Sequence, residues 1–166
     1  MSGNGSSNLP VFAALGAVLR EIVDGTAAEA FLLNQGDRGL LASLELLSAE
    51  AASAVPAAGG ATIAAHADHL RYGLGLMNRW SHGENPFTDA DYSASWRRQQ
   101  VSPEQWRELL DGLRAQAQAW VAAASQPRQV SQVELTGMIA SAAHLAYHLG
   151  AIRQVDRTAI GPPADD

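Results

Sequence analysis

Residues 131–155 read SQVELTGMIASAAHLAYHLGAIRQV, and this stretch decides the fold that we expect for the whole chain. Its first four residues are a capping box. The Ser131 side chain can accept from the backbone N–H of Glu134, and the Glu134 side chain can accept from that of Ser131. A long helix is therefore expected to begin here. The tail GPPADD at 161–166 cannot continue it, because proline lacks the backbone N–H that a helix uses.

The rest of the chain is also predicted to be helical. It has no alternating apolar and polar run of the kind that forms strands, and it is rich in alanine, which favours helix. Apolar residues recur at helical spacing in four more segments, namely 9–24, 38–55, 62–80 and 102–120. We predict an all-α fold: an up-down four-helix bundle at 36–157 with an additional N-terminal helix and connector at 9–35, between flexible tails at 1–8 and 158–166.

Each of these segments carries an apolar stripe that is expected to face the core. The stripes are Phe12, Leu15, Leu19 and Ile22; Leu40, Leu44, Leu47 and Ala51; Ile63, His66, Leu70, Gly73, Met77 and Trp80; and Trp106, Leu109 or Leu110, Leu113, Ala117 and Trp120. A capping box at Ser102 and Gln105 predicts where the fourth segment starts.

The composition indicates a single globular domain and excludes several classes of function. Of the 166 residues, 47% are hydrophobic and 17% are charged. With 17 acidic against 11 basic residues and a net charge of −6, we expect neither a nucleic-acid nor a membrane partner. The chain has no cysteine, which excludes disulfides, thiolate metal ligands and a cysteine nucleophile.

We expect a cytoplasmic protein. The absence of cysteine fits a reducing compartment, and no apolar run reaches the ~18 residues that a membrane-spanning helix needs. The stretch MSGNGSSN at 1–8 lacks the charged and apolar regions of a signal peptide.

Two histidines lie in the middle of one face of the helix expected at 131–155. His144 and His148 are four residues apart, and residues at that spacing share a helix face. The other members of the predicted stripe are mostly small; they are Val133, Gly137, Ala140, Ser141, Ala151, Ile152 and Val155. Small residues beside two imidazoles leave room for a close helix neighbour or for a cavity.

The helix expected at 62–80 can bring further imidazoles to the same place, because His66 falls in its apolar stripe and His69 at the edge. Three neutral imidazoles suit a divalent transition metal and leave positions open for water or substrate. The alternative is that the histidines are core residues without a metal. They would then hydrogen-bond to one another and to Tyr72, Tyr147 or Ser141.

Two other metal sites are not predicted. The helix of a metalloprotease carries a glutamate directly after its first histidine, and here that position is Leu145. The Glu-x-x-His pairs that build di-iron sites in bundles are absent as well.

The loop at 81–101 is expected to form the lid or rim of any site, since it follows the helix that carries His66 and His69. Trp80 and Trp96 could line a pocket, although packing in the core is their expected role. The other residues considered are His82, expected to be exposed; Asp89 and Asp91, expected in turns or caps; Arg153, expected to pair at a helix end; and Trp106 and Trp120, expected in the core or at a dimer interface.

Two stretches resemble the DinB-like superfamily, the damage-inducible-protein-like metalloenzymes. They are HLAYHLGAIRQ at 144–154 and TIAAHADHL at 62–70. The resemblance covers about residues 36–157, including the order and spacing of the helices, and leaves 1–35 unmatched. Members of this superfamily form four-helix bundles in which three histidines bind a divalent metal, usually zinc or nickel. One histidine comes from the second bundle helix and two from the fourth.

Carried over to this chain, the resemblance implies that His144 and His148 are the two ligands from the fourth helix. The ligand from the second helix in similar proteins is followed by Leu or Ile, which matches His69 before Leu70. The predicted metal site is therefore His69, His144 and His148. Helical periodicity alone would favour His66, which stays open as an alternative or additional ligand.

The resemblance also implies candidate activities. Similar proteins include thiol S-transferases that use bacillithiol or mycothiol and a mycothiol-dependent maleylpyruvate isomerase, and homodimers are common among them. We therefore expect a metal-dependent transferase or isomerase that acts on small electrophiles with a low-molecular-weight thiol as cosubstrate. The alternative is a non-catalytic metal-binding or stress-response module whose metal is structural or absent.

Overall fold

The computed structural model describes residues 9–163, and within that range it contains six α-helices, two short 3-10 helices and no strand. The α-helices are α1 (Leu9–Asp24), α2 (Gly39–Glu45), α3 (Ala49–Ser53), α4 (Ile63–Ser81), α5 (Pro103–Ser125) and α6 (Gln132–Val155); the 3-10 helices are η1 (Ala94–Trp96) and η2 (Arg157–Ala159). None of the helices in this range is both long and apolar enough to cross a bilayer.

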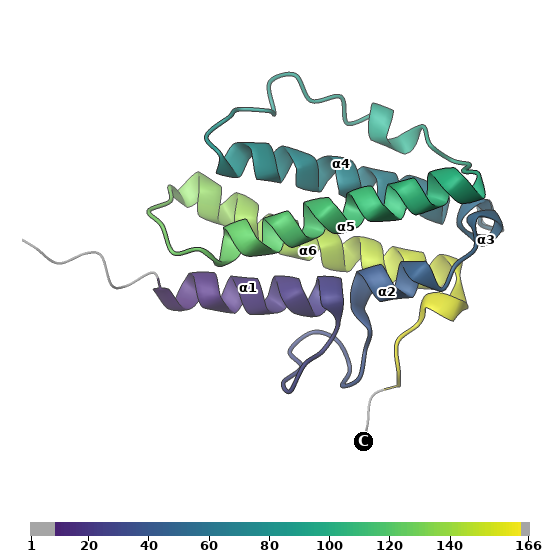
Figure 1. Ribbon diagram of the computed structural model, residues 1–166, viewed down its shortest axis with the longest axis horizontal. Helices are drawn as coiled ribbons and strands as arrows, with labels where there is room; N and C mark the ends of the chain where they lie inside the picture. The colour runs from purple at the N-terminus through teal and green to yellow at the C-terminus, as the bar shows by residue number, and fades with distance from the viewer. Residues whose placement is uncertain (1–8, 164–166) are drawn as a thin grey trace, which may run out of the picture.

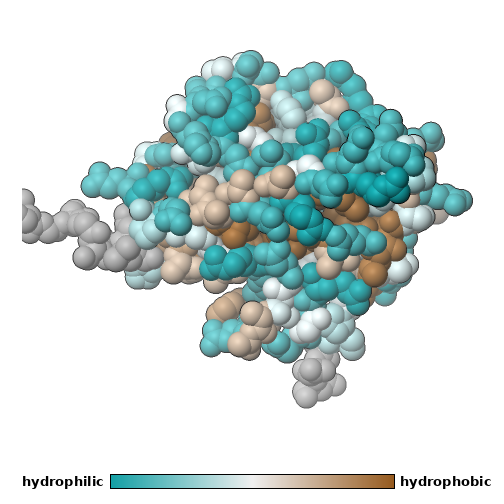
Figure 2. Space-filling view, viewed as in Figure 1, coloured by the Kyte–Doolittle hydropathy of each residue, from teal (hydrophilic) through white to brown (hydrophobic). Residues whose placement is uncertain are grey.

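Four long helices, α1, α4, α5 and α6, pack together along their length (Figure 1). Helix α4 packs against α5 and α6, and α1 packs against the same two helices from the other side. The predicted all-α bundle is confirmed. Its largest fully buried side chains are Trp120, Phe12, Leu19, Ile22, Leu40, Leu44, Ile63, Leu70, Leu113, Met138, Leu145 and Leu149. Burying one such aliphatic or phenylalanine side chain stabilises the fold by roughly 1.5–3 kcal/mol. In the view of Figure 2, hydrophilic residues cover most of the surface and hydrophobic residues show in the middle of the face.

The starts of the long helices follow the capping signals of the sequence. Ser102 with Gln105, and Ser131 with Glu134, each form the complete capping box that was predicted. Thr62 caps α4 with a single bond, since its side chain accepts from the backbone N–H of Ala65, which has no polar side chain to complete a capping box. These caps fix where α4 and α6 begin, and so which turns of the two helices lie side by side.

Helices α4 and α5 run in the same direction although they are consecutive. Arg71 of α4 lies beside Gly112 of α5, and Asn78 donates to both the backbone and the side chain of Gln116 at 3.0 and 2.8 Å. Residue numbers therefore rise together along the two helices. The segment 82–102 allows this, because it runs back along the bundle before α5 begins (Figure 1). An up-down bundle would make consecutive helices antiparallel, and the connection from α4 to α5 departs from that expectation.

The helix expected at 38–55 is divided into α2 and α3. Ser48 lies at the break and caps α3, with its side-chain oxygen accepting from the backbone N–H of Ala51 at 3.1 Å. Serine favours such caps over helix interiors, because its hydroxyl competes for backbone partners. Helix α1, expected as an addition to the bundle, is instead one of its four long helices, with Phe12, Leu19 and Ile22 buried in the core.

A buried glutamate holds the connector that follows α1. The carboxylate of Glu21, only 5% exposed, accepts from the backbone N–H groups of Phe31, Leu32 and Leu33 at 2.6–3.1 Å. Burial by itself raises the pKa of this carboxyl, but the backbone donors outweigh it, and the pKa lies below its ordinary value of 4.5. The sequence left the shape of this connector open, and this contact determines it.

A buried ion pair closes the same end of the molecule. Arg153 of α6 donates to Asp37 at 2.7 Å and to the backbone carbonyl of Ala159 at 3.0 Å. The predicted role of Arg153 in pairing at a helix end is confirmed. Within the tail expected at 158–166, Ala159 is fully buried and residues 160–162 are partly buried, while Thr158 and Pro163 are exposed. The tails expected at 1–8 and 164–166 lie outside the described residues.

Candidate metal centre

The histidines of α4 and α6 meet in the middle of the seam between the two helices. His69 Nε2 lies 3.0 Å from His144 Nε2, and His66 Nδ1 lies 2.8 Å from His148 Nδ1. His69, His144 and His148 each offer a ring nitrogen, and these three nitrogens all lie within 4.8 Å of one another. The antiparallel packing of α4 and α6 produces this meeting, because positions 66 and 69 of one helix face positions 148 and 144 of the other.

The segment 82–102 fixes the orientation of the His69 ring. His69 Nδ1 lies 2.9 Å from the hydroxyl of Ser95, which is itself buried and donates its proton to the carbonyl of Tyr92 at 2.8 Å. The Ser95 oxygen is therefore the acceptor for an N–H on His69 Nδ1. This leaves the lone pair of His69 on Nε2, the nitrogen that faces His144.

A second contact fixes His148. The Nδ1 atoms of His148 and His66 share one proton between them at 2.8 Å, which leaves Nε2 of the 2% exposed His148 for another partner. His66 thus contacts a candidate ligand, while the group of three that could hold one ion contains His69. The ring of Trp96 covers this side of the cluster, stacked on His69 at a centroid distance of 4.2 Å and edge-on to His66 at 5.4 Å.

All four imidazoles have pKa values below the ordinary 6.5. Burial and the neighbouring imidazoles lower the pKa of His148 to about 3 and that of His69 to about 4. Burial lowers the pKa of His66 and of His144 as well. The only carboxylate on α4, Asp68, does not offset this, because it bonds to Arg71 and Arg98. The rings are therefore neutral near pH 7, the form in which histidine binds metals.

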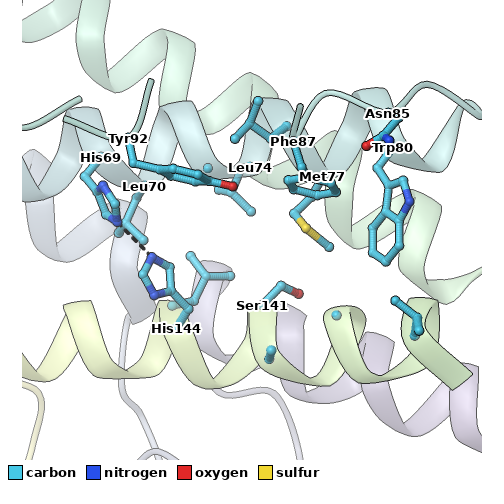
Figure 3. A pocket seen from close by; sticks show the side chains of 16 residues that line it. His69, Leu70, Leu74, Met77, Trp80, Asn85, Phe87, Tyr92, Ser141 and His144 are labelled. Atoms are coloured by element: carbon cyan, nitrogen blue, oxygen red, sulfur yellow. Dashed lines mark hydrogen bonds between the residues drawn. The ribbon is translucent and has the colours of Figure 1, made fainter. Parts of the chain in front are cut away.

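A cavity of about 790 Å³ opens beside the histidines, between α4, α6 and the segment 82–102 (Figure 3). His69 and His144 stand at one end, and Trp80 and Asn85 stand at the other. Its lining is His69, Leu70, Gly73, Leu74, Leu76, Met77, Trp80, Asn85, Phe87, Tyr92, Val133, Gly137, Ala140, Ser141, His144 and Leu145. A volume of this size is typical of a small-molecule site.

The room expected beside the two imidazoles of α6 is a cavity, and Val133, Gly137, Ala140 and Ser141 of the predicted stripe line it. The buried core residues of α6 form a different stripe, namely Met138, Ala142, Leu145, His148, Leu149 and Ile152. Helix α6 is apolar on more than one side, so periodicity could not separate the two faces. Trp80 also lines the cavity, where core packing was expected, and it lies so close to α6 that a Cβ on Gly137 would come within 2.6 Å of its ring.

The donor set fits a divalent transition metal. Two of its nitrogens, one on each helix, already point at each other, and zinc–nitrogen bonds of ~2.0–2.1 Å at a tetrahedral angle place such nitrogens about 3.3 Å apart. Two of the three rings are oriented from behind by hydrogen bonds, as metal-bound histidines usually are. The group could therefore hold a metal, and which residues bind it stays a prediction.

The alternative prediction, that the histidines hydrogen-bond to one another and to nearby hydroxyl groups, is confirmed for the contacts between imidazoles but not for the three partners named. The imidazoles do pair with each other, but their other hydrogen-bond partner is Ser95, which the sequence analysis did not identify. Ser95 is 26 residues from His69, and no spacing rule connects a serine in a loop with a histidine on a helix. Of the three partners considered, Tyr72 accepts from Asp91, Ser141 bonds to Trp120, and Tyr147 packs edge-on against His148.

The remaining residues considered from the sequence lie away from the centre. His82 is exposed and donates to the carbonyl of Asn78 at 2.7 Å, and Asp91 caps the turn at Ala94, both as predicted. Asp89 is exposed. Trp106 and Trp120 are buried in the core, at 4% and 1% exposed.

Comparison with known proteins agrees with this geometry. The family profile described as the DinB superfamily matches residues 32–152, which is most of the chain. No curated protein and no solved structure is significantly similar to this chain. The matched range includes all four histidines of the cluster and leaves out α1. On this match the chain belongs to the DinB superfamily.

Proposed function

We propose that this member of the DinB superfamily is a metal-dependent enzyme in which His69, His144 and His148 hold one divalent ion, zinc or nickel. The observation that carries the proposal is the meeting of three neutral imidazoles at the end of a 790 Å³ cavity. Three protein ligands leave at least one position for another group, and catalytic zinc sites have this ligand count. His69 and His144, the exposed member of the three, both line the cavity, so a ligand in that position would be reached from the cavity.

The reaction we propose is the transfer of a thiol to a small electrophile, or a thiol-assisted isomerisation. A bound divalent ion acts as a Lewis acid that makes a thiolate available near neutral pH. In the transfer, the thiol sulfur forms a bond to the electrophilic carbon, the leaving group departs with the bonding electrons, and the thiol proton passes to water. The thiol must come from a cosubstrate, because the chain has no cysteine.

The surrounding residues have separate tasks in this proposal. Ser95 and His66 hold the rings of His69 and His148 in fixed orientations, so the donor nitrogens need little rearrangement. Trp96, which does not line the cavity, stacks on the ring of His69, and the leucines of α4 give the cavity an apolar wall from which a bound substrate would displace water. Exclusion of water strengthens every electrostatic contact at the reacting atoms.

Turnover by metal-loaded protein tests the proposal. Low-molecular-weight thiols would be assayed against monochlorobimane and maleylpyruvate, with the protein first stripped by chelator and then reloaded with zinc or nickel. We expect activity that saturates with thiol, disappears on chelation and returns with the ion. The double variant His144→Ala/His148→Ala should be inactive, whereas His82→Ala, which changes an exposed histidine outside the centre, should keep full activity.

Metal binding without turnover across that panel would favour the other function, a non-catalytic metal-binding or stress-response module. The direct hydrogen bonds between imidazoles support that alternative, because they give the rings partners when no ion is bound. A centre closed by a fourth protein ligand would support it further.

We also propose that the protein acts as a cytoplasmic homodimer. The outer face of α6 supports a second copy as partner, since Ile139 and Tyr147, which do not line the cavity, are 55% and 69% exposed there. Apolar side chains repeated on one outer face of a helix favour packing against another helix. Tyr147→Glu should turn a dimer into a monomer in sedimentation experiments, while Gln154→Glu on the same helix should not. A wild-type monomer at the highest concentration tested would contradict the proposal.

A further inference from the structure

The lining of the cavity beside the histidines indicates the charge and polarity of the substrate, which the three histidines alone do not. Among the 16 residues that line it there is no Lys, Arg, Asp or Glu. Eleven of the 16 residues are apolar or glycine, and Trp80 and Phe87 among them supply aromatic rings. Tyr92 supplies a third ring. An ionised group moved from water into such a lining would lose hydration without gaining a partner, which is strongly unfavourable.

The few polar atoms of the lining add little capacity to bind a charge. The hydroxyl of Ser141 is already used twice, because it accepts from Trp120 Nε1 at 2.8 Å and donates to the carbonyl of Met138 at 2.7 Å. Tyr92 and Asn85 offer one hydroxyl and one amide, and Figure 3 places the amide at the end far from the histidines. A neutral molecule with one or two polar atoms can satisfy these groups.

The shape of the cavity sets the form of the ligand. From His69 to Trp80 the wall follows eleven residues of α4, which at 1.5 Å per residue is about 16 Å. The opposite wall follows α6 from His144 to Val133 over the same number of residues. Gly73 widens the space, since a Cβ added there would meet nothing within 4 Å.

We propose that this cavity binds an uncharged, elongated and largely apolar substrate, with its electrophilic end at His69 and His144 and its apolar body extending to Trp80. The assignment of the reactive end rests on the proposed function, because the metal centre marks it. An anionic thiol would find no cationic partner along this wall. The thiol cosubstrate must therefore be uncharged or reach the histidines from the solvent side of His144.

A matched pair of fluorescent probes tests the proposal without any need for metal or turnover. N-phenyl-1-naphthylamine is neutral, and 8-anilinonaphthalene-1-sulfonate has the same two aromatic groups with an added sulfonate. We expect the neutral probe to bind the full-length protein at least about tenfold more tightly, a difference of about 1.4 kcal/mol. Gly73→Leu, which fills the open space, should weaken the neutral probe by at least about tenfold.

Gly150→Leu is the matched control, because Gly150 is also a helical glycine with open space around it and lies outside the cavity. It should leave the affinity for the neutral probe within about twofold. Ala140→Phe changes an exposed residue of the lining and provides a second way to fill the cavity if Gly73→Leu does not fold. It should weaken the neutral probe as Gly73→Leu does.

Equal affinity for the two probes, no binding of either probe, or full binding of the neutral probe by both filled variants would each overturn the proposal. These results are separate from those that test the function. Metal-dependent turnover together with equal probe affinities would leave the proposed function intact and refute the substrate class. A clear preference for the neutral probe without turnover would do the reverse.

Discussion

Two groups of polar side chains lie where elements of this bundle pack together, and they differ in the hydrogen-bond partners that they find there. At the connector end, both buried carboxylates have donors: Glu21 has three backbone N–H groups, and Asp37 has Arg153 and the N–H of Gly39. At the seam of α4 and α6, the imidazoles face one another and a cavity, with no carboxylate among their partners.

This difference separates a structural cluster from one prepared for a ligand. Hydrogen bonds that saturate a buried charge stabilise the fold and leave nothing for another molecule. The imidazoles pair with one another and with Ser95 only, and burial together with the neighbouring imidazoles lowers the pKa values of His69 and His148. Several titratable groups with strongly shifted pKa values beside one cavity are typical of functional sites.

The largest effect that this comparison predicts is on stability, at the connector end. Arg153→Met leaves the carboxylate of Asp37, only 4% exposed, without its cationic partner, so the free energy of unfolding should fall by about 3–5 kcal/mol. Urea unfolding of metal-free protein measures this. Metal affinity of the folded fraction should not change.

The control for that variant is Arg107→Met, since Arg107 forms an exposed ion pair with Glu104. Its unfolding free energy should stay within about 0.5 kcal/mol of the wild-type value. If Arg153→Met is no more destabilising than the control, the ion pair between Arg153 and Asp37 does not stabilise the connector end.

The next effect is on metal affinity, at the histidine end. Ser95→Ala removes the oxygen that accepts from His69 Nδ1, so the ring loses its fixed orientation. Affinity for zinc should fall by about 10- to 100-fold, as with other residues that hold a ligand from behind. Competition with a chromogenic chelator measures it. Ser93→Ala, in the same loop but bonded to Asp91, should bind zinc normally, and a drop equal to that of Ser95→Ala would count against an orienting role.

The smallest effect is in the pH dependence of stability, and it distinguishes the two ends by their pH windows. The folded-state pKa values of His148 and His69 are about 3 and about 4, below the ordinary 6.5, so protons bind preferentially to the unfolded chain. Their contribution to the free energy of unfolding is fully present above pH 6.5 and is lost as the pH falls from there to about 4 for His69 and about 3 for His148. The pKa of Glu21 is lowered from 4.5, so its contribution is lost only below that pH.

Metal-free protein in chelator should therefore lose stability in two stages as it is acidified. His148→Gln should flatten the stage that begins at pH 6.5, and Glu21→Gln should flatten only the stage below 4.5. Unfolding free energies measured at half-unit pH intervals test this. Identical pH profiles for the two variants would remove the distinction between the two ends.

Much of the fold could be predicted from the sequence because its signals are local. The capping boxes depend on residues three apart, and one helix brings such residues together. The α5 stripe likewise has spacings of three or four residues; it is Trp106, Leu109, Leu113, Ala117 and Trp120. The break at Ser48 and the parallel course of α4 and α5 depend on how separate segments pack in the folded chain. The spacing of residues within one segment does not predict that packing.

The site divides in the same way. The pair His144 and His148 could be predicted from the i, i+4 spacing, and the resemblance to the DinB superfamily pointed to His69 where periodicity favoured His66. The contacts of Ser95 and Trp96 could not be predicted, because they come from a loop that crosses to α4 only in the folded chain. The small residues Gly137, Ala140 and Ser141 indicated room beside the imidazoles, but periodicity could not separate the cavity face of α6 from its core face, since apolar residues line both.

Metal content tests the central claim most directly: three histidines hold one divalent ion, and His69 is the ligand from α4. Wild-type protein purified without a tag or chelator would be reloaded with zinc, desalted and analysed for metal per chain, beside His69→Ala, His66→Ala and His144→Ala/His148→Ala. The account predicts one ion per chain in the wild type, almost none in the double variant and in His69→Ala, and bound metal with weaker affinity in His66→Ala. Equal metal in the wild type and the double variant, or loss in His66→Ala with retention in His69→Ala, would contradict it.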